Sequence, residues 1–206
     1  MKKIALSIVL LSTCLLADGF FVGISGGVGS NSISEDAYNS NGTENELADN
    51  EKNSIAFMYG IKGGYQYTLR DLHSLKAYWD YTRGDFNSID SNYIKKMSVD
   101  LITANLDYHY DINPRVSIFG GLSLGSVLVD TKGDYGSSNA FGYGINLGID
   151  YDLSDNLELE AKYRYFDANL AEKRFDITAG SSGSSGSKKV SPDDLMIFSI
   201  GLNYKF

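Results

Sequence analysis

Cysteine is almost absent from this chain: its 206 residues include one, Cys14, close to the N-terminus. Proline is scarce, with 2 residues, and no stretch beyond residue 17 approaches the roughly 20 apolar residues that a membrane-spanning helix requires. Basic residues are outnumbered, with 18 Lys and Arg against 26 Asp and Glu. An acidic chain of net charge −8 is a poor ligand for nucleic acid, so no nucleic-acid partner is expected.

Residues 1–17 have the pattern of a secretory signal peptide, in which two lysines precede an apolar run and Ala17 offers a cleavage point. Cleavage there would change the net charge from −8 to −10 and remove the only cysteine, which excludes disulfides and cysteine-based metal sites from the mature chain. Lipoprotein processing at Cys14 is the alternative, although Thr13 is an unusual residue before such a cysteine. The exported domain is predicted to cover residues 18–206.

Tyrosine and glycine are abundant, at 15 and 22 residues, and this composition favours β-strands over helices. Eight segments alternate between apolar and polar residues with the period of two that is typical of a strand with two different faces. Each is close to the 9–11 residues with which a tilted strand crosses a bilayer. The segments are 20–29, 57–67, 74–82, 100–110, 116–128, 141–151, 157–165 and 195–206.

The connections between these segments alternate in length. Three short ones are rich in Asp, Asn and Pro, as tight turns are: 68–73, 111–115 and 152–156. Four are longer: Asn31 to Asn53, Arg83 to Met97, Val129 to Ser138 and Asp167 to Asp193. The first long loop is acidic but lacks the spacing of a calcium loop. The last contains a Gly/Ser tract at 180–187, which is expected to be flexible and which also resembles an engineered linker.

Charges of both signs lie on the polar faces of the segments. They are Lys62, Lys76, Asp80, Asp100, Asp107, Asp150, Glu158, Glu160, Lys162, Arg164 and Lys205. In a soluble β-sandwich, the alternative fold, these side chains would face water. The export signal and the tyrosines beside the short turns, which are typical of a membrane interface, favour a membrane protein instead. Eight strands can close into a small barrel, which satisfies every backbone hydrogen bond in lipid. The predicted fold is an all-β, eight-stranded antiparallel up-and-down transmembrane β-barrel.

These features and the C-terminal aromatic signature of Tyr204 and Phe206 resemble the eight-stranded outer-membrane β-barrels of the OmpA transmembrane-domain and opacity-protein type. The resemblance implies the outer membrane of a Gram-negative bacterium, with short turns in the periplasm and long loops outside. It implies surrounding lipid and lipopolysaccharide, insertion by the barrel-assembly machinery, and a possible host or cell-surface ligand for the loops. OmpA itself continues into a peptidoglycan-binding domain, which is not expected here because the sequence stops at Phe206.

Three functions are compatible with such a barrel. Eight strands leave an interior that side chains just fill, so the inward charges are expected to pair across the lumen and to plug it. A narrow porin-like channel is the alternative. A lipid-modifying enzyme is a third hypothesis, but the two histidines, His73 and His109, lie beside short turns and away from the outer leaflet. His109 is expected to point inward and His73 to begin a strand, and both are expected at the surface or rim. The sequence therefore predicts no catalytic, cofactor or metal-binding residue and a structural or surface-interaction role.

Overall fold

The computed structural model describes residues 19–38, 52–86, 94–133, 137–168, 173–178 and 185–206. Within these ranges, no helix is long and apolar enough to cross a membrane. The described strands are β1 (Phe20–Tyr38), β2 (Lys52–Arg70), β3 (His73–Phe86), β4 (Ile94–Asn113), β5 (Val116–Gly133), β6 (Ser137–Ser154), β7 (Leu157–Ala168), β8 (Lys173–Thr178) and β9 (Ser185–Lys205).

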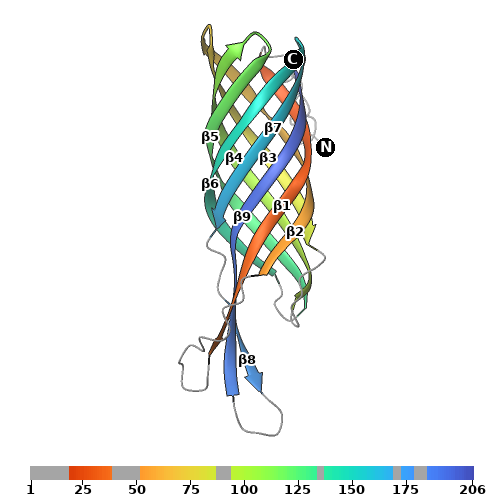
Figure 1. Cartoon of the computed structure of the whole chain (residues 1–206), viewed down its shortest axis with the longest axis vertical. Helices are drawn as coiled ribbons and strands as arrows, with labels where there is room; N and C mark the ends of the chain where they lie inside the picture. Colours follow the sequence, from red (N-terminus) through yellow and green to blue (C-terminus); the bar gives the residue numbers. More distant parts are fainter. Residues whose placement is uncertain (1–18, 39–51, 87–93, 134–136, 169–172, 179–184) are drawn as a thin grey trace, which may run out of the picture.

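Eight of the strands form a closed barrel, as Figure 1 shows. Each strand from β1 to β6 pairs antiparallel with the next one in the chain, β7 pairs with β9, and β9 returns to pair with β1. At this seam, the backbone N–H of Phe206 donates to the carbonyl of Phe20 (2.9 Å). The predicted eight-stranded antiparallel barrel is confirmed.

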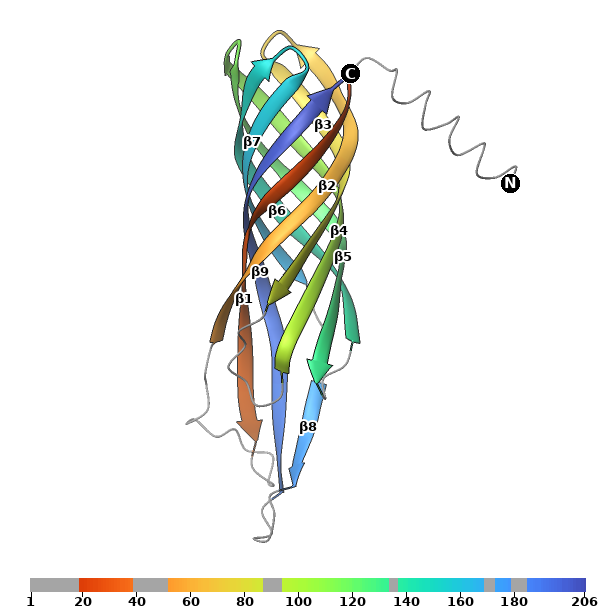
Figure 2. The same cartoon turned by 90° about the vertical axis from the view of Figure 1, so that its right-hand side faces the viewer.

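The two ends of the barrel differ. At one, which we call the turn end, two-residue turns join β2 to β3, β4 to β5 and β6 to β7. They lie within the three short connections that were predicted, because the strands extend farther into each connection than expected. In the second turn, Asn113 Oδ1 accepts hydrogen bonds from the backbone N–H groups of Arg115 (2.9 Å) and Val116 (3.0 Å). The start of β1 and the C-terminus lie at this same end (Figures 1 and 2). We call the opposite end the loop end.

The strands run farther toward the loop end than predicted. β1 continues to Tyr38 and β9 begins at Ser185, so both extend into segments that were expected to be loops. The expected loop from Val129 to Ser138 shrinks to the three residues between β5 and β6. Backbone pairing needs no apolar face, so an antiparallel ladder can continue where the apolar alternation stops.

Beyond the barrel rim, the start of β9 lies between the end of β1 and the additional strand β8. This three-stranded extension projects from the loop end in both views (Figures 1 and 2). The predicted signal peptide of residues 1–17 and positions 180–184 of the Gly/Ser tract lie outside the described residues, and positions 185–187 of that tract belong to β9.

Large apolar side chains cover the outside of the barrel. Ile24, Leu122 and Phe141 are 62%, 64% and 68% exposed, whereas the inward Phe21 and Ser123 are buried. Exposed aromatic residues ring the turn end: Tyr65, Tyr67, Tyr108, Tyr110, Tyr151, Tyr204 and Phe206. A second set of tyrosines faces outward nearer the loop end: Tyr59, Tyr81, Tyr143 and Tyr165. Two belts of aromatic residues, one on each side of an apolar band, are typical of a barrel in a bilayer.

At the seam between β1 and β9, the strands pack so closely that Gly27 has no room for a side chain. A Cβ atom on Gly27 would lie 2.1 Å from the carbonyl oxygen of Phe198 and 2.7 Å from Cα of Ser199, so β1 or β9 would have to move. A Cβ atom on the adjacent, outward Gly26 would lie 3.5 Å from Phe57 Cζ, an ordinary contact.

We therefore expect Gly27→Ala to lower the free energy of unfolding by about 1–3 kcal/mol, because it overpacks the closing seam. Gly26→Ala should leave it unchanged or slightly raised. Urea titration in lipid vesicles, followed by heat-modifiable gel mobility, measures both. Equal stability of the two variants would contradict this account of the seam.

Candidate functional site: a filled lumen

The barrel interior holds most of the charged residues that were predicted to face it. Ten of the eleven point inward: Lys62, Lys76, Asp80, Asp107, Asp150, Glu158, Glu160, Lys162, Arg164 and Lys205. All of these except Lys205 are fully buried, and Lys205 lies near the rim of the turn end. They come from β2, β3, β4, β6, β7 and β9, so the closed barrel brings together residues that are far apart in the sequence.

Near the turn end, Lys76 joins two carboxylates. Its Nζ atom lies 2.7 Å from Asp150 Oδ2 and 2.6 Å from Glu158 Oε1. Glu158 also contacts Lys205 Nζ (2.9 Å) and accepts a hydrogen bond from the Asn203 amide (2.8 Å). These contacts tie β3, β6, β7 and β9 together across the lumen.

Farther along the barrel, Arg164 is the centre of a second cluster. Its guanidinium donates through two nitrogens to both oxygens of Asp80, with Nη1 3.1 Å from Oδ1. It also donates to the side-chain oxygens of Asn146 (2.9 Å) and Asn105 (3.0 Å). Thr103 adds a hydroxyl donor to Asp80 Oδ1 (2.9 Å). Bidentate geometry and additional donors are the conditions under which a buried ion pair is well compensated.

A third group surrounds the Tyr78 ring. Lys62 pairs with Glu160, and both Lys62 and Lys162 lie over the ring, with Nζ 5.6 and 5.3 Å from its centroid. Lys162 Nζ is also 3.5 Å from Asp80 Oδ2 and 3.6 Å from Glu160 Oε1. The Tyr78 hydroxyl donates to Asp107 Oδ2 (2.6 Å). Asp107 also accepts a hydrogen bond from the Asn146 amide (2.9 Å), so Tyr78 links this group to the Arg164 cluster.

The prediction for Asp100 is wrong. Asp100 lies on the outer face, because it shares the parity of the outward Ile102 in β4, whereas the inward positions are the odd-numbered ones. Its carboxylate accepts hydrogen bonds from the Tyr81 hydroxyl and from Arg83 Nη1 (3.2 Å). The group belongs to the polar edge of the apolar band near the loop end.

Both histidines lie near the turn end, as predicted, but His109 is not at the rim. It is buried in the lumen, stacked on Phe119 with ring centroids 4.8 Å apart, and its Nδ1 atom is 3.1 Å from Asp150 Oδ2. His73 begins β3 on the outer face, where its Nδ1 is 2.6 Å from the Tyr108 hydroxyl.

Charge alone did not reveal the uncharged members of the network. Asn105, Asn146 and Ser123 are buried, and the Ser123 hydroxyl lies within hydrogen-bond distance of both asparagine side-chain oxygens (2.7 and 3.0 Å). Ser123 and Asn146 each lie between two inward glycines of their strand, and Asn105 lies between Thr103 and Asp107. Their positions in the period-two pattern of each strand indicate that they face inward, and this was the evidence in the sequence that could have identified them.

The loop-end half of the lumen is apolar, which the sequence analysis did not predict. A cluster of buried side chains, which we call the apolar plug, fills it: Ala56, Met58, Phe86, Met97, Val99, Leu101, Val127, Val129, Phe166, Leu195 and Ile197. These residues occupy the inward-facing alternate positions of their strands, nearer the loop end than the buried charges of the lumen. Where the plug meets the polar network, a void of about 10 Å³ remains beside Lys162 and Arg164, which is room for a single water molecule.

Solved structures share this architecture. The Neisserial surface protein A (NspA) superposes with a TM-score of 0.56 at 22% identity, over 91% of this chain and 97% of that one. OprG from Pseudomonas aeruginosa superposes with a TM-score of 0.57 at 18% identity, over 92% of this chain and 96% of that one. At such low identity, the likeness shows the fold alone.

No curated protein matches the sequence significantly. A family model described as the outer membrane protein beta-barrel domain matches residues 4–206. The chain therefore belongs to the outer-membrane β-barrel family.

Proposed function

We propose that this protein is a non-conducting, non-enzymatic barrel that anchors surface-exposed segments in the outer membrane of a Gram-negative bacterium. The observation that carries the proposal is the filled lumen. A charged network occupies its turn-end half and the apolar plug its loop-end half. An ion that entered from the turn end would have to break paired charges and then cross the apolar plug, which is costly.

The lumen network has a structural role in this proposal. Its ion pairs connect strands on opposite sides of the barrel, such as β3 with β7 through Asp80 and Arg164. Removal of one partner would leave a buried charge without compensation. The network therefore holds the barrel in one shape, on which the loop-end segments are displayed.

The orientation follows from the two ends. The start of β1, the C-terminus and the two-residue turns belong to the turn end, which we assign to the periplasm. The three-stranded extension and the longer connections belong to the loop end, which we assign to the cell exterior. Loops carried by a rigid scaffold are the usual place for recognition, so a host or cell-surface ligand would bind there.

The lumen assignment is tested by single-channel recording in planar bilayers. We expect no long-lived conductance steps from the folded protein, with a general porin as the positive control for insertion. Heat-modifiable gel mobility verifies that the added protein is folded. Long-lived, ion-selective steps would overturn the proposal in favour of the narrow channel.

The orientation is tested separately on intact cells. Added protease should cut within the connection between β1 and β2 and leave the three two-residue turns intact. Cysteines introduced at Asp155 and at Asn139 should differ in labelling by a membrane-impermeant maleimide, with only the Asn139→Cys protein labelled in unbroken cells. The reverse labelling would contradict the assignment of the ends.

A further inference from the structure

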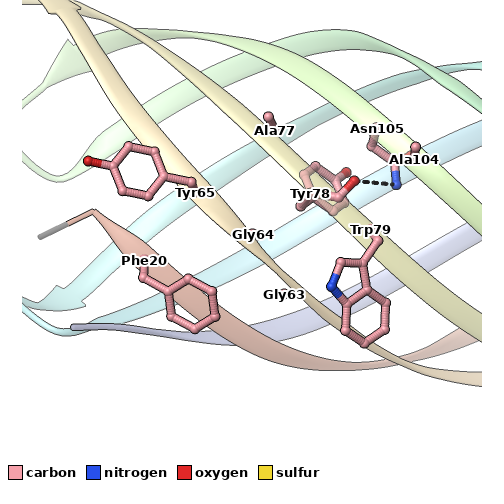
Figure 3. Close-up of a pocket in the computed structure, with 9 residues that line it drawn as sticks. All are labelled: Phe20, Gly63, Gly64, Tyr65, Ala77, Tyr78, Trp79, Ala104 and Asn105. Atoms are coloured by element: carbon pink, nitrogen blue, oxygen red, sulfur yellow. Dashed lines mark hydrogen bonds between the residues drawn. The ribbon is translucent and has the colours of Figure 1, made fainter. Parts of the chain in front are cut away.

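A groove of about 550 Å³ lies on the outer wall of the barrel, over β2, β3 and β4 (Figure 3). The aromatic rings of Phe20 and Tyr65 lie on one side of it, the Trp79 indole lies on the other, and Gly63 and Gly64 lie between them. Ala77 and Ala104 complete the outward lining. Its volume falls within the roughly 300–1,000 Å³ that is typical of small-molecule sites.

The groove exists because small residues interrupt the otherwise bulky outer wall. Gly63 pairs with Trp79, and Trp79 pairs with Ala104, so the indole stands in a row between two small residues. A Cβ atom on Gly63 would lie 3.8 Å from the indole ring, so the ring leans over the glycine. At many other positions on the outer wall, large side chains such as Leu122 and Phe141 face outward.

The chemistry of the groove suits a hydrocarbon chain. None of the residues that line it carries a charge. Its two interior polar residues are engaged elsewhere: Asn105 donates to Thr103 Oγ1 (3.0 Å) and Tyr78 to Asp107. Tyr65, at the edge of the groove, is one of the exposed aromatic residues that encircle the turn end, and such residues lie at the level of the lipid headgroups.

We propose that this groove binds one acyl chain of a glycerophospholipid. Lipid surrounds this wall in an outer-membrane barrel, and a flexible chain fills a concave apolar surface. The lipid class rests on the proposed function: the groove lies just beyond the β2–β3 turn, where Tyr65 pairs with Ala77, and with the turn end in the periplasm this half of the band contacts the phospholipid leaflet.

A second copy of this chain fits the groove less well. A two-fold contact would place groove against groove, and two concave surfaces leave unfilled space between them. In lipid, association also lacks the hydrophobic driving force that would compensate for poor packing.

Trp79 is the only tryptophan, so its fluorescence reports on the groove directly. The folded protein in detergent micelles is titrated with phosphatidylethanolamine that carries brominated acyl chains, which quench indole fluorescence on contact. We expect saturable quenching at about one lipid per protein, because detergent displaces loosely associated lipid but not a chain held in a groove. Linear quenching, equal to that of a free indole ester in the same micelles, would overturn the proposal.

Two leucine variants separate the groove from the general outer surface. Gly63→Leu fills the groove without strain, because its Cβ contacts are 3.7 Å or longer, and binding should weaken about tenfold or more. Gly120→Leu is the matched control: it is outward on β5, away from the groove, its nearest contact is 3.4 Å, and it should bind like wild type. Unchanged binding by the Gly63 variant would overturn the proposal.

Two further outcomes would also overturn it. One is displacement of the brominated lipid by lipid A more readily than by unlabelled phosphatidylethanolamine. The other is a dimer in ultracentrifugation that Gly63→Leu dissociates, which would assign the groove to a second copy. Micelles have no sides and the assay measures no conductance, so failure here is distinct from failure of the recording or labelling tests above.

Discussion

Replacement of Arg164 by alanine should destabilise the folded barrel by about 3–5 kcal/mol, the usual cost of removing one partner of a buried ion pair. Arg164 supplies four of the hydrogen bonds in the middle of the lumen, to Asp80, Asn105 and Asn146. Without it, Asp80 keeps Lys162 at 3.5 Å and the Thr103 hydroxyl, but it loses the bidentate partner. The Asp80 carboxylate would remain buried and incompletely compensated.

The outer wall offers a matched control. Arg83 also pairs with an aspartate on a neighbouring strand, Asp100, but this pair is partly exposed, with Arg83 37% accessible. Arg83→Ala should cost no more than about 1 kcal/mol, as is usual for exposed pairs. Urea titrations in vesicles, monitored by Trp79 fluorescence, give both values. Equal losses for the two arginines would show that burial does not determine the effect.

Replacement of Phe166 by alanine should cost about 3–5 kcal/mol, because it opens a cavity in the apolar plug. The Phe166 side chain has no exposed surface and lies within a cluster that includes Leu195 and Phe86. Its β7 position pairs with Leu195 of β9. Neither water nor lipid can occupy the space at low cost, so the lost contacts are not replaced.

Phe198→Ala is the control for this prediction. Phe198 lies on β9, the strand that pairs with β7, and it is 50% exposed on the lipid-facing wall. Acyl chains can fill the space left there, so no empty cavity forms. The free energy of unfolding should therefore fall clearly less than it does for Phe166→Ala. The same urea titration compares the two variants. If the lipid-facing phenylalanine cost as much as the buried one, the apolar plug would not be the tightly packed layer described above.

The fold could be predicted because each strand carries its own evidence. In β9, Met196, Phe198, Ile200, Leu202 and Tyr204 alternate with smaller or polar residues, and the structure places all five outward. The three short turns were also predictable, because Asp, Asn and Pro favour turns through the conformation of their own backbone and neighbouring residues. β8 and the loop-end extensions were not, because pairing beyond the membrane leaves no alternation between apolar and polar residues.

The lumen shows the same division. Parity assigned ten charged residues to the interior, and a strict use of parity would also have excluded Asp100. Parity equally placed Leu101 and Phe166 inward, but an apolar residue at an inward position looks like a break in the pattern when each strand is viewed alone. Only the assembled barrel shows that such residues from β2, β3, β4, β5, β7 and β9 meet in one plug.

By itself, the sequence determined which face of each strand meets lipid, how many strands close the barrel and where the short turns lie. The reason is that a period of two is a local property of extended backbone. The tertiary structure alone decided that Arg164 meets Asp80 across 84 positions, that the plug seals one half of the lumen, and that Gly63 leaves a groove beside Trp79. Those contacts depend on strand register and barrel closure, which bring side chains from distant strands to the same level along the barrel axis. The sequence of one strand does not contain that information.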